Sequence, residues 1–114
     1  MEYNKLEVWV EARKLTNLVY EFSKVFPKDE IYGLTNQMRR CSVSIPSNIA
    51  EGSGRTSEKE FLHFLNIAIS SSYELETQLI LAEELFNLKT KELIGEITSI
   101  QKMIGGFSRK IKSE

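Results

Sequence analysis

The chain has 114 residues, of which 41% are hydrophobic and 27% charged, a composition typical of a globular domain and not of a disordered segment. Fifteen Lys and Arg residues against sixteen Asp and Glu residues give a formal net charge of -1, which excludes a global basic field for non-specific binding of nucleic acid. We therefore expect one domain over residues 1–114, and any contact with nucleic acid must come from a local group of basic side chains.

The single cysteine, Cys41, has no partner for an internal disulfide. The chain does not open with a basic segment followed by an apolar one, the pattern of a secretory signal. No run approaches the roughly 18 consecutive apolar residues that a membrane span needs. These observations predict a cytoplasmic protein that makes no membrane contact.

The first predicted helix spans residues 4–25 and stops before Pro27. Asn4 is expected to cap it, with Glu7 as the third-position partner. One face repeats apolar residues at alternating spacings of four and three, as a buried helix face does, and this face contains Val8, Ala12, Leu15, Val19, Phe22 and Phe26. Pro27 supplies no backbone donor and restricts the residue before it, so a tight connection follows.

The second predicted helix runs from about Asp29 to Glu51, with Glu30 near the positive end of the helix dipole. Its inward residues are Leu34, Met38, Cys41, Ile45 and Ile49. Pro46 lies inside this helix and removes the hydrogen bond to the Ser42 carbonyl, at a cost of about 3 kcal/mol without compensation. The helix either kinks here or ends and restarts, and we favour the kink because the apolar spacing continues across the proline.

Gly52 to Gly54 are expected to end the second helix, since glycine tolerates the left-handed conformation that often follows a helix. Ser57 and Glu60 have the spacing of a capping box, so the third helix is predicted over residues 58–87. Its buried face is the most regular in the chain, with Phe61, Leu65, Ala68, Ser72, Leu75, Leu79, Ala82 and Phe86. The fourth helix follows residue 90, with Leu93, Ile97, Ile100, Ile104, Phe107 and Ile111 on one face. Together these elements predict an all-α, antiparallel up-down-up-down four-helix bundle with a proline kink in the second helix.

The antiparallel register places small residues of two helices at one level, opposite Gln37 of the second helix. These are Ser71 and Ser72 of the third helix and Gly105 and Gly106 of the fourth. We predict that the helices approach closely there, that Gln37 fills the remaining gap, and that large residues at Ser71 or Gly105 are destabilising.

Apolar residues also occur away from the buried face of the third helix, at Ile67, Tyr73, Ile80 and Leu81. Scattered apolar residues are ordinary on a protein surface, whereas a set that gathers on one face marks a site for a partner. We favour the second interpretation and predict an oligomer interface at these four residues.

The sequence shows no pattern of catalytic or metal-binding residues. One histidine and one cysteine do not supply the three or four ligands of a zinc site, and the acidic pairs lack the Glu-x-x-His spacing of di-iron bundles. Glu74 and Glu76 point to different helix faces, and His63 is expected at the surface. We therefore predict no enzyme, no metal, no cofactor and no small-molecule substrate. Catalysis would require a ligand in a pocket near Gln37 and Asn48.

Four basic residues near the second turn are candidates for a nucleic-acid or anion site, namely Arg39, Arg40, Arg55 and Lys59. The turn itself has glycines and hydroxyls before a helix start, a combination that binds phosphate in some proteins, but it lacks the spacing of a P-loop and no strand precedes it. The alternative is an ordinary connection, with the arginines paired to Glu51, Glu58 or Glu74.

Three motifs follow one another along the chain: VWVEARKL at Val8–Leu15, YGLTNQMRRCSVSIPSNIAEGSGR at Tyr32–Arg55 and EFLHFLNIAISSSYELETQL at Glu60–Leu79. In these motifs the sequence resembles the 23S rRNA-intervening sequence protein family, also called the four helix bundle protein family. The resemblance implies an antiparallel bundle with a proline inside the second helix, and a homopentamer around a central axis. It also implies kinship with the accessory proteins of diversity-generating retroelements, which are basic pentamers that bind nucleic acid and a reverse transcriptase.

We therefore predict a non-enzymatic oligomeric module, a homopentamer by the resemblance, that binds RNA or a nucleoprotein partner through the region of Arg39, Arg40, Arg55 and Lys59. The alternative is a scaffold pentamer without a nucleic-acid role, in which those arginines pair with neighbouring acids. Binding of RNA that weakens as salt is raised distinguishes the two.

Overall fold

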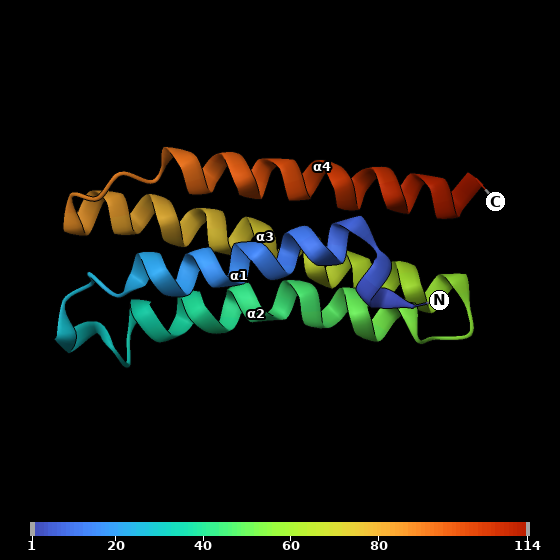
Figure 1. Cartoon of the computed structure of the whole chain (residues 1–114), viewed down its shortest axis with the longest axis horizontal. Coiled ribbons are helices and arrows are strands. Elements are labelled where there is room, and N and C mark those ends of the chain that lie inside the picture. Colours follow the sequence, from blue (N-terminus) through green and yellow to red (C-terminus); the bar gives the residue numbers. More distant parts are fainter. Residues whose placement is uncertain (1, 114) are drawn as a thin grey trace.

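Four long helices make up a computed structural model that describes residues 2–113 (Figure 1). They are α1 (Glu7–Ser23), α2 (Leu34–Ser53), α3 (Glu58–Phe86) and α4 (Lys91–Ser113), with short 3-10 turns η1 (Tyr3–Lys5) and η2 (Lys28–Glu30). The described residues contain no strand, so the predicted all-α class is confirmed. Each helix packs beside the preceding one and α4 closes the bundle against α1, within a body of 46 × 23 × 20 Å.

Consecutive helices are joined at alternate ends of the bundle, as Figure 1 shows. Side-chain contacts follow the same direction: Arg39 of α2 reaches Ser23 near the end of α1, whereas Ser42, further along α2, is reached by Thr16, further back in α1. Glu76 of α3 likewise accepts a hydrogen bond from Gln101 of α4 at 2.9 Å. Together with the connections in Figure 1, these contacts indicate an up-down-up-down order.

The core contains the apolar faces that the spacing predicts. All of their residues are buried except Phe22, Leu34, Phe86 and Phe107, which are partly buried and pack against the core. The four ion pairs among the described residues link residues three or four apart, and none joins two helices. Exposed pairs of this kind add little stability, so burial of apolar side chains holds the helices together.

The helix starts differ from the prediction at two places. Asn4 does not cap α1, because it lies in η1 and α1 begins at Glu7 without a side-chain cap. The second helix begins at Leu34 and not near Asp29, since residues 28–30 form η2. Glu30 still acts at the start of α2, because its Oε1 accepts the backbone N–H of Leu34 at 3.1 Å.

The turn between α2 and α3 also differs in detail. α2 continues through Gly52 to Ser53, and Gly54 has a right-handed φ of -85°, so no left-handed glycine ends the helix. The left-handed residue is Asn87, with φ 56°, at the end of α3. The start of α3 matches the expectation, because Ser57 Oγ accepts the backbone N–H of Glu60 at 3.1 Å.

Gly52 is needed where α2 meets α3. A Cβ atom at this position would lie 2.7 Å from the Cβ of Phe64 and 2.9 Å from Cδ1 of Phe61. Gly52 therefore permits close packing of the two helices, and it does not end α2.

The predicted close approach of three helices is wrong for α4. Ser44 and Ser71 hydroxyls lie 2.7 Å apart, so α2 and α3 do come close at this level. A Cβ at Gly105, however, would have only Arg109 of its own helix within 4 Å, at 3.4 Å. Gln37 is exposed and fills no gap. The position of a residue in the chain sets its level along the bundle but not the direction in which it faces, and the glycines of α4 do not face α3 closely.

Pro46 lies inside α2, and the helix is continuous across it, which excludes an end and restart. The bend itself stays a prediction. The Ser42 carbonyl, which loses its helical donor to the proline, is fully buried and accepts the Thr16 hydroxyl of α1 at 2.9 Å. The same hydroxyl lies 3.2 Å from the Ala12 carbonyl. Thr16 thus supplies the missing donor from a neighbouring helix.

We expect Thr16→Val to lower the free energy of unfolding by about 1–3 kcal/mol, because it leaves the buried Ser42 carbonyl unpaired. In a Pro46→Ala background the cost should fall by about 1 kcal/mol, since the new backbone N–H of residue 46 replaces the lost donor. Urea unfolding of the four proteins measures both costs. Equal costs in the two backgrounds would show that Thr16 does not compensate for the proline.

Candidate nucleic-acid interface

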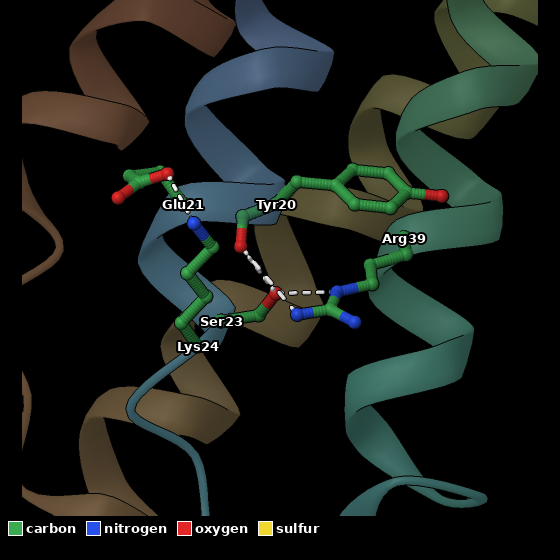
Figure 2. A network of polar contacts seen from close by, with 5 residues as sticks. All are labelled: Tyr20, Glu21, Ser23, Lys24 and Arg39. Carbon is green, nitrogen blue, oxygen red and sulfur yellow. Dashed lines mark hydrogen bonds and ion pairs between the residues drawn. The ribbon is translucent and has the colours of Figure 1, made fainter.

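Arg39 is held against α1 by neutral partners (Figure 2). Its Nε donates to Ser23 Oγ at 2.8 Å, and one terminal nitrogen lies 3.5 Å from the Tyr20 carbonyl. The guanidinium carbon is 5.0 Å from the centroid of the Tyr20 ring. Because no carboxylate is among these partners, Arg39 forms no ion pair with another described residue, and N–H donors remain for a ligand.

Arg40 projects toward α3, on the other side of α2. It lines a polar hollow of about 640 Å³ together with Ser71, Glu74 and Gln78 of α3. Arg40 is exposed and forms no ion pair with another described residue, so the predicted pair with Glu74 is not formed, although both line the hollow. Arg40 is thus available to an anionic partner.

Arg55 and Lys59 lie at the turn between α2 and α3. Arg55 pairs with Glu51 at 2.9 Å, one of the acids that the sequence offered as a partner, and its guanidinium carbon is 4.8 Å from the centroid of the Phe64 ring. Lys59 is exposed in the first turn of α3 and forms no ion pair with another described residue. Of these two residues, only Lys59 has no carboxylate partner among the described residues.

The four basic residues do not form one contiguous group. Arg39 and Arg40 are neighbours on a helix, so their side chains diverge by about 100°. Arg40 and Arg55 are separated by about 20 Å along the bundle, at 1.5 Å per residue. A ligand that contacts all four would have to extend along α2, as a nucleic-acid strand does.

Two further basic residues near Arg39 were overlooked in the sequence. Lys24 and Lys28 line a hollow together with Arg39 at the connection from α1 to α2. The signal was the position of the two lysines on either side of Pro27, where a helical hairpin brings the connection back to the start of the second helix. This signal is visible only when the hairpin is already assumed.

The predicted interface residues of α3 form two lines on the helix. Tyr73 (55% exposed) and Ile80 (43%) are seven residues apart and share one side of the helix. Leu81 (43% exposed) and the partly buried Ile67 lie on another side, about 100° away. Leu85, 67% exposed, extends this second line and was missed in the sequence.

Cys41 is buried between α2 and α3, where its Sγ donates to the Ser71 carbonyl at 3.1 Å. Burial, and then the hydrogen bond and negative charge of Glu74, raise the pKa of the thiol to about 12. The thiol is therefore protonated at neutral pH and unsuited to nucleophilic attack.

Within residues 2–113 no three His, Cys, Asp or Glu side chains gather as metal ligands do. No helix in the same range has the length and apolar character to cross a membrane.

Comparison with known proteins adds a family and a fold. The model of the family described as 23S rRNA-intervening sequence protein matches residues 4–106. A crystal structure of a protein of unknown function from the S23 ribosomal protein family of Bacteroides thetaiotaomicron aligns with a TM-score of 0.82 and 21% sequence identity. The alignment covers 96% of this chain and 99% of that one, so the two share the whole fold. No curated protein sequence matches the chain.

Proposed function

Because the chain belongs to the 23S rRNA-intervening sequence protein family, we propose that it is a non-enzymatic homopentamer that binds RNA, alone or within a nucleoprotein. The observation that carries the assembly on which this proposal rests is the outer surface of α3. A helix whose inward face is already filled by the bundle also exposes Tyr73, Ile80, Leu81 and Leu85. Several large apolar side chains exposed on one helix favour a protein partner.

The two lines on α3 fit a ring. In a cyclic oligomer with more than two subunits, each subunit uses two different surfaces, one toward each neighbour. Tyr73 and Ile80 would contact one neighbour, whereas Leu81 and Leu85 would contact the other. Two neighbouring copies of the chain therefore cover both lines with one kind of contact.

The basic residues support binding of an anionic polymer. Arg40 and Lys59 are exposed without an ion pair to a described residue, and Arg39 is held by neutral groups. With a net charge of -1 for the whole chain, attraction to phosphate must act over these local sites. Assembly into a ring repeats each site and so adds contacts without a basic sequence.

Binding of a single-stranded RNA measured over a range of salt concentrations tests the nucleic-acid part. We expect affinity to fall as salt rises, and Arg40→Gln to reduce the slope of log K against log salt by about 0.7, the loss of one phosphate contact. Lys102→Gln is the matched control, because it removes one exposed positive charge from α4, away from the proposed residues. No binding at low salt would argue against RNA as the ligand, and an equal effect of the two variants would argue against Arg40 as a phosphate contact.

A scaffold pentamer without a nucleic-acid role is the second candidate. The pair between Arg55 and Glu51 favours it, because that arginine is already neutralised within the chain. In this case the ring forms but RNA does not bind at any salt concentration.

A further inference from the structure

A hollow of about 390 Å³ lies where α1 leads through η2 into α2. Its volume is within the range of about 300–1,000 Å³ that is usual for small-molecule sites. The residues that line it include three cations, Lys24, Lys28 and Arg39, and no carboxylate. The hollow is therefore a candidate for an anionic ligand, and it is separate from the Arg40 hollow on the α3 side of α2.

The cations differ in how firmly they are held. Arg39 is fixed by Ser23 and Tyr20, with terminal N–H groups left over (Figure 2). Lys28 is exposed and forms no ion pair with a described residue. Lys24 pairs with Glu21 at 3.0 Å, but both side chains are exposed, so an incoming anion exchanges with that carboxylate at little cost. A phosphate thus meets one pre-oriented guanidinium and two mobile ammonium groups.

One hydroxyl group in the lining of the hollow has an unused hydrogen-bonding capacity. Thr35 is 3% exposed and lines the hollow, and its hydroxyl has no hydrogen-bond partner among the described residues. Buried hydroxyls nearly always have a partner, so an acceptor is expected to reach it. The nearest acid in sequence, Glu30, already accepts the Leu34 N–H. A phosphate oxygen is an acceptor of the required kind.

The remaining lining is apolar and consists of Phe26, Pro27 and Ile31, the last 45% exposed. An inorganic anion makes no use of such a surface, whereas the flat face of a nucleobase does. We infer that this hollow binds a nucleoside monophosphate, with its phosphate at Arg39, Lys28 and Thr35 and its nucleoside against Pro27 and Ile31. The choice of nucleotide over other phosphorylated ligands rests on the proposed binding of RNA.

Amide chemical shifts of the full chain, titrated with adenosine 5′-monophosphate at low salt, test this site. We expect shifts confined to residues 23–39, and at least about tenfold weaker binding for adenosine alone and for inorganic phosphate alone. Lys28→Gln should weaken binding of the nucleotide about tenfold, and Thr35→Val should weaken it too, whereas Lys102→Gln should not. Thermal unfolding of each variant shows whether the fold is retained. Because Lys28 is exposed and Thr35 is buried, Lys28→Gln is the variant less able to disturb the fold.

The absence of shifts near the hollow would overturn the inference, as would equal weakening by Lys28→Gln and Lys102→Gln or equal affinity for inorganic phosphate. Competition identifies the source of the nucleotide: a short single-stranded RNA that displaces the monophosphate makes an RNA nucleotide the ligand, and RNA that leaves it in place makes it a free nucleotide. If RNA fails to bind at low salt while the nucleotide still binds, the proposed function fails and the site stands. If RNA binds through Arg40 and the nucleotide does not bind, only the site fails.

Discussion

Gly52→Ala is expected to lower the free energy of unfolding by about 1–3 kcal/mol, the cost of forcing an extra methyl into a filled contact. On helix propensity alone the same change would raise it by about 1 kcal/mol. The contact decides the sign, because the added Cβ would lie 2.7 Å from the Cβ of Phe64, an atom that cannot move without its helix. The added methyl must therefore push α2 and α3 apart.

Gly95→Ala is the matched control for this prediction. Gly95 also lies inside a helix, but a Cβ there would meet nothing within 4 Å. The free energy of unfolding of the Gly95→Ala variant should therefore rise by about 0.5–1 kcal/mol. Urea unfolding of both variants compares the two signs directly, and a stabilised Gly52→Ala protein would show that α2 and α3 do not need the glycine.

Ile80→Lys and Leu81→Lys are expected to convert the proposed oligomer into monomers, each by placing a charge in one of the two proposed contact surfaces. Both residues are 43% exposed in the single chain, so the fold should tolerate the change within about 0.5 kcal/mol. Size-exclusion chromatography gives the assembly state, and circular dichroism checks that the helices persist.

Leu18→Lys serves as the control, because Leu18 of α1 has the same 43% exposure but lies outside the α3 lines. This variant should keep the assembly of the natural protein. Dissociation by Leu18→Lys, with both α3 variants still assembled, would move the interface to α1.

The sequence predicts the bundle because a helix with one buried face has apolar residues at spacings of three and four, and this spacing can be read directly along the chain. Every position of the α3 face from Phe61 to Ala82 is buried, and the capping position Ser57 accepts its predicted N–H. The start of α2 was placed several residues too early, since the charge of Glu30 marks the helix start from a preceding turn and not from inside the helix. Charge preference near a helix end does not fix its first residue.

The candidate site was less visible in the sequence because it depends on directions between helices. Arg39 and Arg40 are adjacent in the chain but face α1 and α3 respectively. Lys24 and Lys28 join Arg39 only after the hairpin has folded. The role of Gly52 was misread for the same reason, since a turn glycine and a packing glycine look alike until Phe64 is placed against it.

Light scattering of the natural protein in solution, measured as it elutes from a size-exclusion column, tests the central claim that the chain works as a ring. We expect one species with five times the mass of a single chain, stable at high salt because its contacts are apolar. A monomer at every concentration tested would contradict the proposed ring, because the exposed residues of α3 would then have no partner among copies of this chain.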